Sequence, residues 1–114
     1  SKGYINIDLV KYTQDIRNSL EKTDKSNSNE IETLEYLLSI SDKCTKMDVE
    51  QFWSECKSIV EEVDNRRQKL SIGLLKRAHT SLLFILTRCT RLLMVLQEDH
   101  RNQEFWFLNA EHFR

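Results

Sequence analysis

Apolar and polar positions alternate with a helical period between Leu70 and Glu98, the stretch with the densest apolar content in the chain. One row of residues advances by steps of four and three, so it lies on a single face of an α-helix. Its members are Leu75, His79, Leu82, Leu86, Cys89, Leu93 and Leu96. Further apolar residues widen this face. A helix that is apolar over most of its circumference is usually surrounded by others, so we predict a central helix with shorter helices packed around it.

The rest of the chain carries shorter helical patterns separated by polar loops. The predicted helices span residues 5–22, 29–45, 49–69, 72–98 and 103–112. Short polar loops between long helices favour antiparallel neighbours. Zero Pro and only two Gly leave almost nothing from which to build tight hairpins, which argues against an all-β fold. We therefore predict one all-α domain over residues 1–114, a monomeric up-and-down four-helix bundle with a short fifth C-terminal helix.

The third helix has the clearest start signal. Asp48 is the predicted N-cap and Gln51 stands at the third helical position, a capping box with Asp in place of Ser or Thr. Met47 before the cap and Phe52 after it form a predicted hydrophobic staple. A second start is predicted at Asn29, which would cap the helix that follows it.

Charge is unevenly distributed along a chain whose net charge is −1. Residues 1–65 hold eight Lys or Arg and fourteen Asp or Glu, whereas residues 66–97 hold seven Lys or Arg and no acid. The last segment, residues 98–114, holds two bases and four acids. The central helix and the loop before it therefore form a basic strip in an otherwise acidic molecule.

The cysteines and the apolar runs bear on compartment. Three widely separated cysteines fit a reducing, cytoplasmic environment better than a disulfide scaffold. The longest apolar runs have five residues each, far short of the roughly 20 that a membrane helix needs, so we expect no membrane span. No targeting segment is visible, and the first residues resemble an arbitrary edge, so we expect the chain to be a piece of a longer protein.

No catalytic, cofactor or metal motif emerges from the sequence. The spacings CxxC, HxxxH and HExxH of close-set metal ligands are missing, so the cysteines are expected to be small core residues. The glycine-rich patterns GxGxxG and GxxxxGK[ST] are missing as well, which argues against nucleotide binding. We expect no catalytic, cofactor-binding or metal residue in this chain.

His79 supports an alternative function. Histidine phosphotransfer domains are also four-helix bundles of this size, and they carry an exposed histidine on a helix. The segment Arg77-Ala78-His79-Thr80 has a passing likeness to their motif. However, His79 falls in the core-facing row of the central helix, so a buried histidine is the favoured interpretation.

The basic strip is the strongest functional signal, and the terminal aromatic run Phe105-Trp106-Phe107 is the second. The predicted partner-binding residues are Arg66, Arg67, Lys69, Lys76, Arg77 and Trp106. They would dock an acidic protein partner, whereas nucleic acid is disfavoured because the whole chain is near neutral. Pairing of the same cations with Glu35, Glu61 or Glu62 inside the bundle is the other interpretation, and it would leave a purely structural spacer.

One long string resembles a known family. The order FW…C..IV…D.RRQ.L..G.LK..H..LLFILTRCTRLL, from Phe52 to Leu93, is similar to a segment upstream of the kinase domain in the plant Ser/Thr kinases named for incomplete root hair elongation. The last three helices more loosely resemble the helical pre-kinase domain of the microtubule-associated Ser/Thr kinases (MAST). Residues 1–47 match only in helical pattern, and Met94–Arg114 departs from the plant pattern.

This resemblance implies a non-catalytic regulatory module from an AGC-type Ser/Thr protein kinase. The partner would be an acidic or cytoskeletal protein, or the kinase domain of the same chain. ATP and Mg²⁺ are implied only for that kinase domain, because the chain has no Gly-rich kinase loop, HRD or DFG motif of its own.

Overall fold

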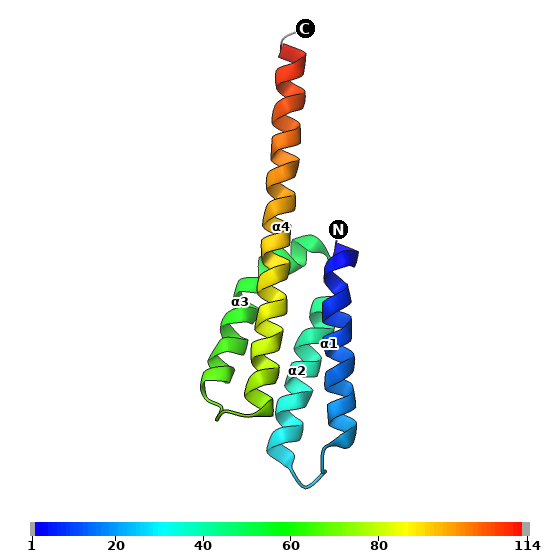
Figure 1. Ribbon diagram of the computed structural model, residues 1–114, viewed down its shortest axis with the longest axis vertical. Coiled ribbons are helices and arrows are strands. Elements are labelled where there is room, and N and C mark those ends of the chain that lie inside the picture. Colours follow the sequence, from blue (N-terminus) through cyan, green and yellow to red (C-terminus); the bar gives the residue numbers. More distant parts are fainter. Residues whose placement is uncertain (1, 113–114) are drawn as a thin grey trace.

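Four α-helices make up the fold of the computed structural model, which describes the backbone of residues 2–112 and the side chains of residues 6–96. The helices are α1 (Lys2–Lys22), α2 (Ser28–Lys46), α3 (Val49–Gln68) and α4 (Leu74–His112). They run alternately down and up along one long axis (Figure 1). The all-α, up-and-down prediction is therefore confirmed within the described residues.

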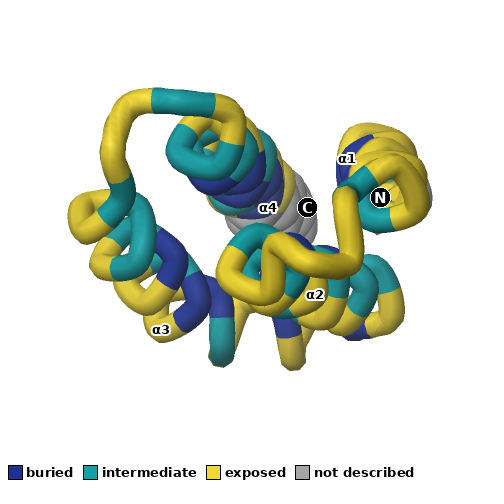
Figure 2. The backbone as a smooth tube through the Cα atoms, turned by 90° about the horizontal axis from the view of Figure 1, so that it is seen from below, coloured by how far each residue is buried: buried dark blue, intermediate teal, exposed yellow. Residues whose placement is uncertain are grey.

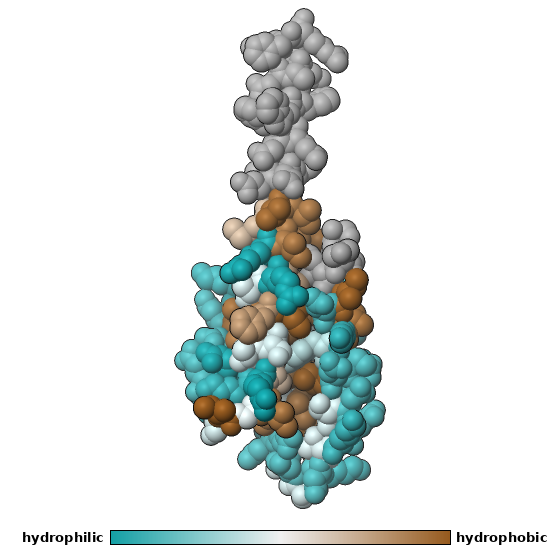
Figure 3. Space-filling view, in the orientation of Figure 1, coloured by the Kyte–Doolittle hydropathy of each residue, from teal (hydrophilic) through white to brown (hydrophobic). Residues whose placement is uncertain are grey.

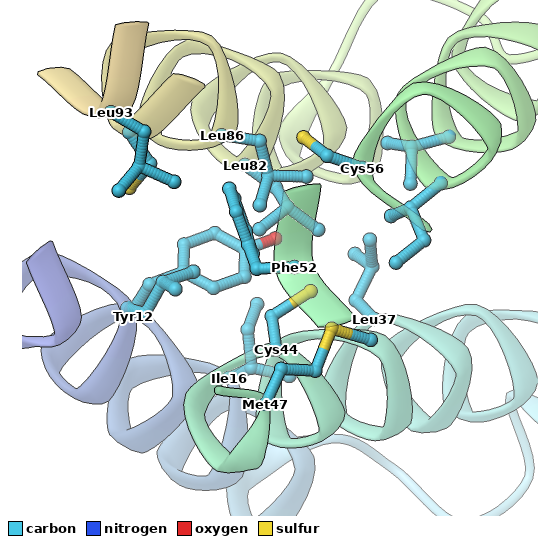
Figure 4. Close-up of a cluster of buried hydrophobic side chains, with 14 of the residues drawn as sticks. Tyr12, Ile16, Leu37, Cys44, Met47, Phe52, Cys56, Leu82, Leu86 and Leu93 are labelled. Atoms are coloured by element: carbon cyan, nitrogen blue, oxygen red, sulfur yellow. The ribbon is translucent and has the colours of Figure 1, made fainter. Parts of the chain in front are cut away.

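The helices pack as two antiparallel pairs. α1 packs mainly on α2, and α3 packs mainly on α4, while α4 also touches both α1 and α2 (Figure 2). α4 thus joins the two pairs, while direct contacts of α3 with α1 and α2 are fewer. Side chains from all four helices meet in the core around Tyr12, Leu37, Phe52 and Leu86 (Figure 4).

The predicted start of α3 is confirmed. The Asp48 side chain accepts a hydrogen bond from the backbone N–H of Gln51 at 2.8 Å, while Met47 and Phe52 are both buried. Only Met47 and Asp48 separate α2 from α3, so this cap also fixes the turn between the two helix pairs.

The predicted N-cap of α2 is wrong by two residues, although the helix itself begins at Ser28, one residue before the predicted range. Its N-cap is Asn27, whose side chain accepts from the N–H of Glu30 and donates to the Glu30 carboxylate at 2.7 Å. The Asn27 side chain thus caps the first turn and is itself held by Glu30, and it begins the helix earlier than the predicted cap at Asn29 would.

The predicted fifth helix is not a separate element. α4 continues without a break to His112 and projects past the ends of the other three helices (Figure 1). Residues 98–103 contain polar side chains but neither Pro nor Gly, so nothing in the backbone interrupts the helix there. At 1.5 Å per residue its 39 residues span about 58 Å, against the molecule's longest extent of 72 Å.

α4 is covered on one side rather than surrounded. Its buried stripe consists of His79, Leu82, Leu86, Cys89 and Leu93, all of which belong to the predicted row. Other large apolar side chains of α4 face solvent instead: Phe84, Leu92, Met94, Val95 and Leu96. The prediction of shorter helices packed around a central helix is therefore correct for one side of α4 and wrong for the other, and Leu96 of the predicted row is exposed.

α1 is attached to α4 by a specific polar contact as well as by apolar packing. The Tyr12 hydroxyl donates to the backbone carbonyl of Ala78 at 2.7 Å, and burial raises the pKa of this hydroxyl. The bond joins a side chain of α1 to the backbone of α4. It therefore fixes the position of α1 along the axis of α4.

Leu74–Leu96 is long and apolar enough, by length and composition alone, to cross a membrane. The core helix of a globular bundle passes the same test. Here one stripe of this segment packs against three helices, which is the arrangement of a core helix.

Leu86 is fully buried and Phe84 is 66% exposed on the same helix, which gives a matched test of the packing. Leu86→Ala is expected to lower the free energy of unfolding by about 2–5 kcal/mol, because it removes buried methyl groups and leaves a cavity. Phe84→Ala is expected to change it by about 0.5 kcal/mol or less. Urea unfolding followed by circular dichroism measures both, and equal losses would contradict the assigned faces of α4.

The cap of α3 is testable in the same assay. Asp48→Ala is expected to cost about 1 kcal/mol, because the N–H of Gln51 loses its acceptor. Ser54→Ala, at an exposed position inside the same helix, serves as the control and is expected to leave stability unchanged or slightly higher. A loss at Ser54 as large as that at Asp48 would show that the cap is not the cause.

Candidate functional site

Five cations lie around the turn that joins α3 to α4, and we call this group the basic turn. Its members are Arg66, Arg67, Lys69, Lys76 and Arg77. The first three stand at the end of α3, and the last two stand in the first turn of α4. Because α3 and α4 are antiparallel, the fold brings all five to one end of the molecule (Figure 1).

Two members of the basic turn have partners inside the bundle. The guanidinium carbon of Arg66 lies 3.5 Å from the centroid of the Tyr36 ring on α2, a cation–π contact. Arg67 forms an ion pair with Asp64 one turn earlier, with Nη2 and Oδ1 2.9 Å apart. The sequence suggested Glu35, Glu61 or Glu62 as partners. Among the described side chains, neither arginine forms an ion pair with any of them.

The remaining three members reach solvent. Lys69 and Arg77 are exposed and Lys76 is half-buried, and no ion pair of theirs occurs among the described side chains. The first turn of α4 contains no acidic residue, so the positive end of the helix dipole adds to the charge of Lys76 and Arg77. The basic turn is therefore a local concentration of positive potential that the fold leaves partly uncompensated.

The rest of the basic strip has other surroundings. Arg88 forms an ion pair with Asp8 of α1 at 2.8 Å, but both side chains are at least half exposed, so the pair contributes little stability. Arg91 lines a groove between α3 and α4. Trp106, the remaining predicted contact residue, lies outside the described side chains.

His79 is buried at the contact between α4 and α2. Its side chain has no exposed surface, and Nδ1 lies 2.7 Å from the carbonyl of Leu75. Burial lowers the pKa of the imidazole below its usual 6.5, and the positive charges of Arg66 and Arg67 act in the same direction. The neutral ring donates from Nδ1–H, which leaves Nε2 buried as an acceptor without a hydrogen-bond partner.

This environment rules out the phosphotransfer alternative for the folded domain. A histidine that receives a phosphoryl group must reach a partner protein, whereas both nitrogens of His79 are enclosed. The interpretation of His79 as a core residue is correct.

Tyr36 is the residue of this region that sequence reasoning missed. Its ring stacks on that of His79, with centroids 6.4 Å apart and planes at 20°, and it also lies under Arg66. Burial and the nearby Glu62 carboxylate raise the pKa of its hydroxyl to about 12. No motif marks Tyr36, because its role depends on the packing of α2 against two other helices.

The three cysteines are all buried, as predicted for core residues. Burial raises the pKa of the Cys89 thiol to about 11, with a further contribution from nearby Cys56, so this thiol stays protonated at neutral pH. A protonated, enclosed thiol is a poor nucleophile.

Comparison with known proteins identifies the family. The family model described as the IREH1-like domain matches residues 1–97, which cover the whole bundle up to the point where α4 projects. The chain belongs to this family. The resemblance read from Phe52 to Leu93 is therefore confirmed, and it extends over the first two helices as well.

Three relatives from Arabidopsis thaliana carry this domain. The chain is 41% identical to the probable serine/threonine protein kinase IREH1 over 104 residues. These residues are 91% of this chain and 8% of the relative. It is 40% identical to the probable kinase IRE over 86% of the chain, and 34% identical to the probable kinase IRE4 over 94%. It thus spans 8–10% of the length of these relatives. No solved structure matches.

The burial of His79 predicts a pH dependence. The unfolded chain protonates this imidazole near its usual pKa of 6.5, whereas the folded protein keeps it neutral to lower pH. The unfolded state therefore binds more protons as the pH falls below 6.5, and the stability that the neutral ring provides is lost progressively there.

Two measurements check this prediction. NMR titration of the His79 ring should give a pKa below 6.5. His79→Leu should flatten the dependence of the unfolding free energy on pH between about pH 7.5 and pH 5.5. An unchanged slope would show that another group causes the dependence.

Proposed function

We propose that this chain is a non-catalytic docking domain of a larger Ser/Thr protein kinase, and that it binds an acidic protein surface through the basic turn. The partner is a separate acidic or cytoskeletal protein, or the kinase domain of the same polypeptide. The observation that carries this proposal is the cluster of Lys69, Lys76 and Arg77 at the α3–α4 turn, which reaches solvent without ion pairs among the described side chains.

The kinase context rests on the relatives. All three are named as probable serine/threonine protein kinases, and this chain matches only a small part of each. The chain itself has none of the kinase motifs. Catalysis, with its ATP and Mg²⁺, then belongs to another part of the parent protein, which we assign to the AGC group, and the domain serves it by recognition. Kinship with the MAST pre-kinase domain and a cytoplasmic location belong to the same proposal.

Electrostatic physics explains why a cluster would act where single charges do not. One exposed ion pair contributes at most about 1 kcal/mol, and salt screens it. Several like charges on one convex turn sum to a local potential that attracts an acidic surface and orients it on approach. Binding of this kind weakens steeply as the salt concentration rises.

A structural spacer is the competing function, and the two partnered arginines are the observation in its favour. Arg66 joins α3 to α2 through Tyr36 and Arg67 pairs with Asp64 within α3, so their charge serves the fold as well. A useful test must therefore avoid these two residues.

Lys69→Glu combined with Arg77→Glu provides such a test. Lys69 is the C-cap residue of α3, where a negative charge is unfavourable to the helix dipole. Arg77 lies in the first turn of α4, where a negative charge is favourable. The two effects oppose each other, so the net change in stability is small. We expect this double variant to weaken binding of a fluorescent glutamate-rich peptide by about tenfold or more, measured by anisotropy at low salt.

The control is Lys11→Glu combined with Lys25→Glu, two exposed positions on α1 and on the α1–α2 turn. It makes the same change in net charge and is expected to leave most of the binding intact. Equal loss in both double variants would indicate a nonspecific charge effect and contradict docking at the basic turn. Undiminished binding in the Lys69 and Arg77 variant would also contradict docking at the basic turn, and absence of binding in the unaltered domain would favour the spacer.

A further inference from the structure

An apolar groove of about 590 Å³ runs along the outer side of the α3–α4 pair, separate from the basic turn. It is lined by Trp53, Cys56, Lys57, Val60, Glu61, Thr87, Thr90 and Arg91. Trp53 is 41% exposed although it is one of the largest apolar side chains in the chain. In Figure 3 α3 lies at the left and α4 in the middle, where brown side chains border teal ones.

The groove continues along α4 as an exposed stripe. Phe84, Thr87, Arg91 and Met94 follow one another at steps of three, four and three, so they share one side of the helix. Thr87 and Arg91 line the groove. Phe84 precedes them along α4 and Met94 follows them, and both are exposed. The stripe from Phe84 to Met94 is about 15 Å long, which equals about three turns of a second helix.

The floor of the groove suits an apolar ligand surface. The Thr90 hydroxyl donates to the carbonyl of Leu86 at 2.9 Å and lies 3.1 Å from the sulfur of Cys56. Its hydrogen-bonding capacity is used within the bundle, so covering it would leave no unpaired polar group. The groove is mostly apolar and its charged lining residues are Lys57, Glu61 and Arg91, so the side chains of an amphipathic helix fit it better than a small polar ligand does.

The charge on the rim selects the kind of helix. α4 contributes no acid between Leu74 and Gln97, and Arg91 borders the groove with no ion pair among the described side chains. Lys57 stands on the α3 rim, where Glu61 is the single acidic lining residue. A partner with carboxylates on the flank that faces α4 is therefore complementary to this surface.

We propose that the α3–α4 groove binds an amphipathic acidic helix of a protein partner, with apolar residues against Trp53 and Val60 and carboxylates beside Arg91. A second copy of this chain fits less well, because the α4 stripe is basic and free of acids in both copies. An anionic membrane also fits less well, because the groove is concave and its α3 side carries Glu61.

A pair of designed peptides tests the inference. Each has about 15 residues, with Leu at helical spacing on one face. One carries Glu along both flanks of that face, and its twin carries Lys. The Glu peptide is expected to shift the amide NMR signals of the groove residues and to bind measurably, while the Lys peptide does not.

Two variants locate the binding. Trp53→Ala should weaken binding of the Glu peptide by about tenfold or more, because it removes the aromatic anchor. Arg91→Glu, at an exposed position where folding is not at risk, should weaken the Glu peptide and permit binding of the Lys peptide. Lys25→Glu, on the α1–α2 turn, is the control and should bind the Glu peptide like the unaltered domain.

The outcomes separate this groove from the basic turn. Binding that survives Lys69→Glu with Arg77→Glu but fails in Trp53→Ala and Arg91→Glu supports the groove, whatever becomes of the proposed function. Equal binding of the twin peptides would overturn it, and so would groove variants that bind like the unaltered domain. Concentration-dependent dimerisation lost in Arg91→Glu, or binding to phosphatidylserine vesicles lost in Trp53→Ala, would assign the groove to a different occupant and also overturn the proposal.

Discussion

Burial of one stripe of α4 is the constraint on which the rest of this structure depends. The residues from His79 to Leu93 that face inward form the stripe of α4 against which α3 packs closely and α1 and α2 pack as well. The loops are too short and too polar to hold the pairs together by themselves, and exposed ion pairs such as Arg88–Asp8 contribute little. Shared burial against α4, reinforced by the bond from Tyr12 to Ala78, is what turns two helical hairpins into one bundle.

Much of the fold was readable from the sequence because helical periodicity and capping are local signals. The Asp48 cap and its Met47–Phe52 staple need only six residues of sequence, and the structure reproduces them. The errors have equally physical origins. A periodic stripe shows which side of a helix is buried, but it does not show whether the opposite side is covered, so the exposure of Phe84 could not be foreseen. Likewise, the predicted break between residues 98 and 103 is absent, because the polar residues there permit a continuous helix.

The candidate site was predictable in position but not in detail. The acid-free run from Arg66 to Gln97 pointed to the α3–α4 turn, and antiparallel packing gathers its cations there. Which cations are engaged depends on contacts between helices far apart in the sequence, such as that of Arg66 with Tyr36. The groove was also invisible to pattern reasoning. Trp53 has the spacing of a core residue, yet it is 41% exposed, because none of the helices described covers that side of α3 and α4.

The unbroken course of α4 has a mechanical consequence. One helix runs from inside the bundle to His112 without interruption. The packing of Leu82, Leu86 and Leu93 fixes how this helix is rotated about its axis, and it therefore sets the direction of every later position on the helix. Adding a single residue beyond Leu96 would rotate everything after it by about 100° and advance it by about 1.5 Å. The bundle therefore fixes the orientation of the projecting part of α4 about the helix axis. Insertions or deletions in that part would rotate whatever follows it and would not simply lengthen a flexible connection.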